Sequence, residues 1–429
     1  MEFHDILHGV IRFEDQNIKS LLAELLNSPE IHRLRNMRQM NFDVPLIQEL
    51  GRSRRLPHSI GVAYIALTLA HRAALNSQDT KILLCAALLH DAAIPPYGHL
   101  VESEFKSLQP AFNHEHRLST IIYGTISPQN IYDDIVPGRQ LGLLTIFNKY
   151  KIEPKKVLEM VCPPKGGKSS ISADVDIDNI DNVHRMAAML GWSGAKTNAR
   201  KLVERCRIGP DSNLCFLESA LENLSKWLDY RQRIYTMIIA HPECIPQNAL
   251  QADLVRLAVR EKVISPDDWK VTEPVFEERL RKNSITQHLA DQLISGCQYQ
   301  LIDYIWFKNY ENKISLTNAQ IIDQLNISVP VGEEYGYFVW NEKGLISREV
   351  TVSIESGSEV TIGKNSTSCM IALIKKTPGW PRRLKKEHSE WRLNIADAFV
   401  KLSNNINFAT DFPESYTGNF TSSSNELQF

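Results

Sequence analysis

Apolar residues recur at helical spacing along the N-terminal two thirds of the chain. Between them, the cluster Ile94-Pro95-Pro96 cannot continue a helix and marks an end. The helical pattern resumes after the loop at 163–172 and persists from Asn198 to about Gln298. The pattern also predicts a loop at 44–57 and helices at 18–26, 31–40, 59–75 and 80–90.

The pattern changes after Tyr304. Alternating and β-branched residues with turn residues between them predict strands at 335–340, 348–356, 359–363 and 369–376. A helix is expected at 391–402, followed by a flexible tail at 415–429. The fold is therefore predicted to be mainly α, with a helical body at 1–306 and a smaller α+β unit at 307–414.

Composition excludes several classes of protein. The net charge of -2 gives no general attraction to nucleic acid, although the basic stretch 375–388 is either a solvated linker or a nucleic-acid contact. Seven scattered cysteines without a CxxC pair indicate a reduced compartment. No signal-peptide pattern and no membrane-length apolar run is present. We expect a cytoplasmic protein without membrane contact.

Three segments with apolar residues at helical spacing carry two imidazoles and two carboxylates, at His58, His90, Asp91 and Asp178. Each alone is typical of a helix end. Together they form a donor set that suits Zn, Fe or Mn, and an octahedral ion would keep positions for water and a phosphate oxygen. The combination predicts a hydrolytic metal centre.

Several carboxylates surround the last of these positions. Asp178 and Asp181 share a helical face, and Arg185 follows one turn after Asp181. Asp181 is therefore either a support or substrate contact of the centre, or the partner of Arg185 in an ion pair. Asp174 and Asp176 are expected to cap the helix.

Three further stretches accompany these residues: HDILHGVI at 4–11, NSPEIHRLRNMRQM at 27–40 and FNHEHRLS at 112–119. Their order resembles the HD-domain superfamily, and in particular the deoxynucleoside triphosphate (dNTP) triphosphohydrolases. That group includes bacterial dGTP triphosphohydrolases and the animal enzyme that joins a sterile-alpha motif to an HD domain. The resemblance is good over residues 1–190 and continues thinly to about residue 306.

The resemblance implies roles for individual residues. It makes Asp178, the middle acid of DxDxxD, the ligand that completes the set with His58, His90 and Asp91. It implies that His114 is the general acid, that Glu102 orients it and that His99 lies near the reacting phosphate. One divalent transition metal (Fe, Mn or Zn) is expected in the site, with Mg accompanying the triphosphate. Arg55 and Lys168 are candidate phosphate contacts, of which the planar guanidinium of Arg55 is the better suited.

The sugar end of the family pocket is less complete. Gln39 stands where the family contacts deoxyribose, Met40 where an apolar residue excludes a 2′-hydroxyl, and Tyr235 where a tyrosine packs against the sugar, although a core tyrosine fits the pattern of Tyr235 equally well. Asp181 is a further candidate substrate contact. Departures from the animal enzyme occur at Ile94, Asn179, Asn182 and Met186.

These features together predict a hydrolase that releases deoxynucleoside and inorganic triphosphate from dNTPs, for housekeeping or for antiviral depletion of nucleotides. The resemblance implies a homo-oligomer, a tetramer or hexamer, that responds to nucleotides. Arg35 fits a regulatory position, whereas Asn27 and His32 depart from the guanine-reading pattern. Two alternatives stay open: an HD phosphodiesterase or nuclease acting on oligonucleotides, and a nucleotide-sensing module with little turnover.

Overall fold

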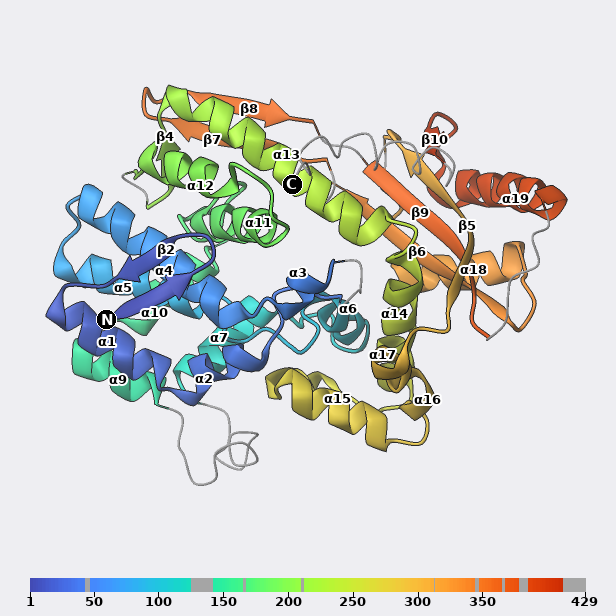
Figure 1. Ribbon diagram of the computed structural model, residues 1–429, viewed down its shortest axis with the longest axis horizontal. Coiled ribbons are helices and arrows are strands. Elements are labelled where there is room, and N and C mark those ends of the chain that lie inside the picture. The colour runs from blue at the N-terminus through green and yellow to red at the C-terminus, as the bar shows by residue number, and fades with distance from the viewer. Residues whose placement is uncertain are drawn as a thin grey trace.

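A computed structural model of the chain is mainly helical, with a smaller sheet-containing C-terminal region (Figure 1). The predicted fold class is thus confirmed. The structure describes residues 1–42, 47–124, 142–164, 167–209, 212–311, 313–343, 347–364, 367–377 and 385–411. The predicted tail at 415–429 lies outside these ranges.

Three helices form the centre of the N-terminal part: α4 (Arg55–Arg72), α5 (Ser77–Leu89) and α11 (Ile177–Met189). Helix α4 packs against both of the others, and twelve of its residues are buried. Burial of one large aliphatic side chain contributes roughly 1.5–3 kcal/mol, so this helix is firmly anchored. The surrounding elements are α1 (Gln16–Leu26), α2 (Pro29–His32), η1 (Arg33–Asn36), α3 (Gln48–Arg52), α6 (His99–Leu108), α7 (His114–Ile122), α9 (Leu143–Tyr150), α10 (Pro154–Val161) and α12 (Ala195–Glu204).

A short antiparallel hairpin precedes these helices. It consists of β1 (Glu2–Asp5) and β2 (Gly9–Arg12), with Asp5 paired to Gly9 across the turn. The long α13 (Leu221–Ala240) and α14 (Ile245–Arg260) lead from the helical body towards the C-terminal sheet (Figure 1). They are followed by η4 (Pro266–Lys270), α15 (Glu273–Lys282), α16 (Gln287–Ala290) and α17 (Gln292–Ser295), and η3 (Glu218–Ala220) precedes α13.

The C-terminal sheet has the strand order β10-β5-β9-β6 and is antiparallel throughout. Helices α18 (Asn318–Ser328) and α19 (Lys385–Ser403) accompany it. Buried residues of this sheet and of the two helices form a second hydrophobic core, which includes Phe307, Ile321, Ile371 and Phe399. The strands are β5 (Gln300–Lys308), β6 (Tyr335–Lys343), β9 (Thr367–Lys375) and β10 (Ala409–Asp411).

A second four-stranded sheet joins distant parts of the chain. Its order is β3-β4-β7-β8, and β4 pairs in parallel with β7 through Cys215 opposite Ser353. The strands are β3 (Cys206–Ile208), β4 (Leu214–Phe216), β7 (Glu349–Ile354) and β8 (Glu359–Gly363). Two strands from beyond residue 306 therefore extend a sheet that begins in the helical part, and the predicted division at 306 stays a prediction.

Some predicted boundaries were wrong. Helix α4 begins at Arg55, so His58 lies inside the helix and not before it, and α3 occupies part of the predicted loop. The helix expected at 31–40 ends with η1, because Met37 is extended. Strands β3 and β4 interrupt the stretch expected to stay helical, since they are too short to produce a clear alternation.

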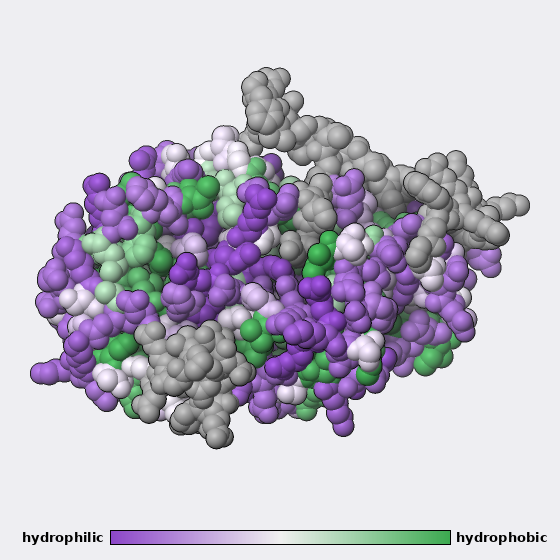
Figure 2. Space-filling model, turned by 60° about the horizontal axis from the view of Figure 1, so that its bottom comes forward, coloured by the Kyte–Doolittle hydropathy of each residue, from purple (hydrophilic) through white to green (hydrophobic). Residues whose placement is uncertain are grey.

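One face of the molecule is seen in a space-filling view. The face in Figure 2 is largely hydrophilic, with small separate hydrophobic patches. No helix in the described part of the chain is long and apolar enough to cross a membrane.

Candidate metal centre

Three helix termini bring the predicted ligands together. His58 lies in the first turns of α4, His90 is the C-cap of α5, and Asp178 lies in the first turn of α11. Helix α11 starts here because the Asp176 carboxylate accepts a hydrogen bond from the Asn179 backbone N at 2.7 Å. Asp176 thus caps the helix as predicted. Asp174 does not; it pairs with Lys168 at 3.3 Å.

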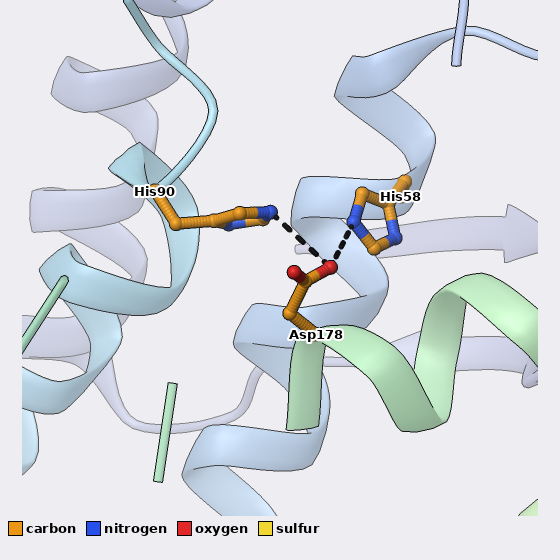
Figure 3. Close-up of side chains that lie close together, drawn as sticks. All are labelled: His58, His90 and Asp178. Atoms are coloured by element: carbon orange, nitrogen blue, oxygen red, sulfur yellow. Dashed lines mark hydrogen bonds and ion pairs between the residues drawn. The ribbon is translucent and has the colours of Figure 1, made fainter. Parts of the chain in front are cut away.

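The ligand atoms converge on one point (Figure 3). His58 Nε2 lies 2.9 Å from Asp178 Oδ1, and His90 Nε2 lies 3.6 Å from the same oxygen. The ligand atoms of the three residues all lie within 4.8 Å of one another. The two imidazole rings are nearly perpendicular, at 86°, so they approach the carboxylate from different directions.

The outer nitrogens of both imidazoles are engaged by protein acceptors. His58 Nδ1 lies 2.8 Å from Asp181 Oδ1, and His90 Nδ1 lies 2.9 Å from the Ala87 carbonyl. These contacts turn Nδ1 of each ring outward and direct Nε2 of both rings inward, towards Asp178. His90 Nε2 is buried and has no hydrogen-bond partner among the described residues.

The electrostatics of the cluster favour a cation. Burial by itself would lower the pKa of His90, but the carboxylates of Asp91 and Asp178 outweigh it and raise this pKa to about 10. Similarly, His90 and His58 overcome burial and hold the pKa of Asp178 far below its ordinary value. The donor set consists of two imidazoles and a carboxylate, and one of the imidazoles has an inward nitrogen without a hydrogen-bond partner among the described residues. This set fits a divalent Fe, Mn or Zn ion.

Asp91, the fourth predicted ligand, stands beside this group. Its Oδ2 lies 3.5 Å from His90 Nε2 and 2.5 Å from Arg55 Nη1. Arg55, the predicted phosphate contact, is itself buried. The structure thus places the two residues side by side at the edge of the cluster, and their predicted roles stay predictions.

Asp181 and Arg185 form the ion pair that was one of the two sequence interpretations. Arg185 Nε lies 2.7 Å from Asp181 Oδ1, and both side chains are buried. Asp181 also faces His58 Nδ1, so the pair supports a metal ligand at the same time. Gly61 makes the close approach possible, since a Cβ there would lie 2.2 Å from Asp181 Oδ2. This geometry favours the supporting role over a substrate contact.

The predicted proton-transfer residues form a second cluster. His99 Nδ1 and His114 Nδ1 lie 3.0 and 3.1 Å from the same Glu102 oxygen, Oε2. The Glu102 side chain is 3 % exposed, whereas that of His99 is 64 % exposed. Burial would raise the pKa of Glu102, but His114 and His99 lower it far below its ordinary value. Glu102 is therefore an anion that two histidines share.

The residues predicted to contact the sugar have different environments. Gln39 Nε2 donates to Asn182 Oδ1 at 3.2 Å, and Gln39 Oε1 is buried without a hydrogen-bond partner in the described ranges. Met40 belongs to the main hydrophobic core and is 9 % exposed. Tyr235 lies on α13, and its pKa is raised by burial and also by the charge of Asp178, which places it near the cluster.

Two residues of the site had no predicted role. His8 Nε2 lies 2.7 Å from Asp181 Oδ2, and Asp5 Oδ2 lies 2.6 Å from Arg185 Nη1. Both belong to the stretch HDILHGVI, which matched the family without suggesting a function. The only sequence signal was that match, because contacts between positions so far apart leave no local pattern.

Comparison with known proteins agrees with this geometry. Residues 55–186 match the family model described as HD domain, which supports placing this stretch in the HD-domain superfamily. The chain is 24% identical over 248 residues to "Uncharacterized protein YwfO" of Bacillus subtilis, covering 56% of this chain and 52% of that protein. It is 22% identical over 306 residues to "Uncharacterized protein MJ1154" of Methanocaldococcus jannaschii, covering 66% and 58%. The chain thus spans just over half the length of these curated relatives.

Proposed function

We propose that the protein is a metal-dependent triphosphohydrolase that cleaves a dNTP into deoxynucleoside and inorganic triphosphate. The position of Arg55 between the two clusters carries this proposal. Its Nη1 contacts Asp91 at the edge of the metal cluster, and its Nη2 lies 3.0 Å from where a Cβ on Gly98 would be. Gly98 directly precedes His99, so a cation suited to phosphate lies between the predicted ligands and His99, which shares Glu102 with the predicted acid His114.

In the proposed reaction, a water oxygen bonds to the α-phosphorus and the bond from that phosphorus to the ribose 5′-oxygen breaks. The divalent metal supplies charge neutralisation and a more acidic water when bound. Arg55 and His99 neutralise phosphate charge, and His114 delivers a proton to the departing 5′-oxygen. Catalysis rests on positioning and electrostatic stabilisation and needs no covalent intermediate.

The contact between Glu102 and His114 supports the acid role. Glu102 Oε2 lies 3.1 Å from His114 Nδ1, so the carboxylate fixes the orientation of the imidazole ring. The remaining nitrogen, Nε2, is then the atom that donates to the substrate. His114 is only slightly exposed, at 12 %, which suits a donor in a shielded site.

The preference for a deoxyribose rests on Gln39, Met40 and Tyr235. Gln39 and Asn182 touch each other, and Asn182 stands where the family pattern has a tyrosine. An orphaned buried amide oxygen on Gln39 offers an acceptor for a substrate hydroxyl. We infer that the substrate is a dNTP, that the active form is a homo-oligomer, and that nucleotides regulate it.

The alternatives are less well supported. A nuclease would use the basic stretch, but Lys375 is buried and Lys376 Nζ lies 2.6 Å from Asp253; residues 378–384 lie outside the described ranges. A sensing module would be favoured by the absence of the family's polar residue at position 94. Ile94, however, packs with Leu34 and Met37 in a small apolar cluster, so a structural reason accounts for the apolar side chain there. Both alternatives are nevertheless outcomes of the test.

The test is product analysis of the purified chain with each dNTP, each ribonucleotide and single-stranded DNA, in the presence of Mn, Fe, Zn or Mg. Equal amounts of deoxynucleoside and inorganic triphosphate are expected from dNTPs, and the His114→Ala variant should form them more slowly by about 100-fold or more. Shortened oligonucleotides would replace the proposal with a nuclease. Nucleotide binding without any product would replace it with a sensor.

A further inference from the structure

The turn of the N-terminal hairpin is ordered by one carboxylate. Asp5 Oδ1 accepts hydrogen bonds from the backbone N of Leu7 at 2.8 Å and of His8 at 2.9 Å. Gly9 follows with a φ of 73°, a conformation that side-chain-bearing residues rarely adopt. The turn therefore has a defined shape that presents His8.

The other oxygen of Asp5 connects this turn to α11. Asp5 Oδ2 lies 2.6 Å from Arg185 Nη1, and the Arg185 side chain is 2 % exposed. Arg185 in turn donates from Nε to Asp181 Oδ1 at 2.7 Å and from Nη2 to Asp181 Oδ2 at 3.0 Å. The carboxylates of Asp5 and Asp181 flank the guanidinium, and their negative charges compensate for its burial. Figure 1 shows the hairpin lying against this part of the helical body.

Asp181 receives four hydrogen bonds in total. Besides the two from Arg185, its Oδ1 faces His58 Nδ1 at 2.8 Å and its Oδ2 faces His8 Nε2 at 2.7 Å. A carboxylate has about four lone-pair positions, so all are used. The Asp181 side chain is fully buried, so the loss of one donor leaves a buried carboxylate oxygen without one of its partners. Its plane, and with it the plane of the His58 ring, is therefore fixed from both sides.

We propose that His8 is a positioning residue of the metal centre. It acts through Asp181, which holds the His58 ring so that Nε2 points to Asp178 and His90. The N-terminal hairpin is then part of the centre, although it lies outside the stretch 55–186 that matches the HD domain. This inference rests on the metal dependence in the proposed function and not on the identity of the substrate.

The experiment measures metal affinity without any substrate. Cobalt(II) is titrated against a competing chelator while its visible absorption is recorded, for the wild type, His8→Phe and His8→Gln. His8→Phe keeps a ring but removes the donor, and we expect affinity to fall about 10- to 100-fold, the usual effect of losing such an outer partner. The absorption spectrum should change as well. His8→Gln retains an N–H donor and should recover part of the lost affinity.

The matched control is His4→Ala. His4 lies in the same hairpin, its side chain is 81 % exposed, and it pairs only loosely with Glu2 at 3.6 Å. This variant should bind cobalt as the wild type does. A folded His8→Phe variant with wild-type affinity and spectrum would overturn the proposal.

A second comparison covers the case in which His8→Phe does not fold. His8→Gln and His8→Asn differ by one methylene, and only the longer side chain reaches Asp181. The proposal requires tighter cobalt binding by the glutamine variant, and equal affinities would refute it. Because no nucleotide is present, a wild type that binds cobalt but leaves dNTPs intact would overturn the proposed substrate and leave the role of His8 standing.

Discussion

Arg55 and Asp91 form a buried ion pair in which Nη1 lies 2.5 Å from Oδ2 and the two side chains are 5 % and 10 % exposed. Burial would raise the pKa of Asp91, but Arg55 and His90 lower it far below its ordinary value. The predicted phosphate contact and the predicted fourth ligand therefore depend on each other. Any change at one alters the charge balance at the other.

Loss of this pair should destabilise the fold. Arg55→Met leaves the buried Asp91 with only His90, at 3.5 Å, as a partner of opposite charge among the described residues, so the free energy of unfolding should fall by about 3 kcal/mol. Urea denaturation with a chelator present measures this without a contribution from metal. The control is Lys226→Met, whose exposed pair with Glu222 should leave stability unchanged. Equal stabilities for Arg55→Met and wild type would mean that the pair is not formed in solution.

Removal of the inward nitrogens should remove the metal. The double variant His58→Ala/His90→Ala and the single variant Asp178→Asn should contain only background metal and show no hydrolysis, while circular dichroism stays helical. Elemental analysis after purification measures the metal content. His71→Ala, an exposed histidine at the other end of α4, is the control. Full metal occupancy in the double variant would contradict the assignment.

His114 should affect chemistry more than binding. His114→Ala should lower kcat by about 100-fold or more while substrate still binds, as expected for loss of a general acid. Glu102→Gln should lower it less, because the imidazole remains. Single-turnover kinetics with a saturating dNTP separate the two effects, with the exposed His116→Ala on the same helix as control. An unchanged kcat in the His114 variant would transfer the role to His99.

Met40 is the residue predicted to exclude the 2′-hydroxyl of a ribonucleotide. A bulky apolar side chain next to the sugar offers a 2′-hydroxyl no hydrogen bond, so dNTPs should be preferred several-fold to a few hundred-fold in kcat/KM. Met40→Ala should reduce this ratio. Since Met40 lies in the core, the variant should also lose about 2–5 kcal/mol of stability, and rates must be compared below its Tm. Equal kcat/KM values for dNTPs and ribonucleotides in the wild type would show that Met40 does not exclude ribose.

His184 gives a pH dependence that is separate from the metal centre. Its Nδ1 lies 2.7 Å from the Ile180 carbonyl and its Nε2 2.8 Å from Asn198 Nδ2, an arrangement of the neutral ring, and burial lowers its pKa to about 4. In the unfolded chain, His184 has its ordinary pKa of about 6.5. As pH falls through that value, the unfolded state therefore takes up a proton on His184 before the folded state does. The stabilisation is complete above that pH and is lost towards pH 4.

Between about pH 8 and pH 5, this loss should amount to about 2 kcal/mol of the free energy of unfolding. Urea denaturation at several pH values, compared with His184→Gln, isolates the contribution of this one group. The variant should show the smaller dependence on pH over this interval. Parallel curves would show that folding does not lower the pKa of His184.

The parts of the molecule that a local pattern encodes were predicted from the sequence. Helices α4 and α5 have continuous apolar faces, and β6 and β9 have the β-branched and aromatic residues of buried strands. The sequence predicted that His58, His90, Asp91 and Asp178 share one centre. The structure brings ligand atoms of His58, His90 and Asp178 within 4.8 Å of one another and leaves Asp91 at the edge of this group.

The remaining parts depend on contacts between distant positions. Strands β1 and β2 have four residues each and are half exposed, so they show too little alternation to predict. The contact of His8 with Asp181 spans 173 positions, and the mutual burial of Arg55 and Asp91 depends on how α4 and α5 pack. Sequence reasoning could name Arg55 and Asp91 but not their pairing.

The parallel pairing of β4 with β7 has a consequence for how the chain folds. Helices α13 to α17 and the first strands of the other sheet lie between Cys215 and Ser353 in the chain, so this pairing closes a long loop. Closing so long a loop is entropically costly, and non-local pairing of this kind is slow. We expect this sheet to acquire protection from hydrogen exchange late in refolding, after the helices that carry the metal ligands.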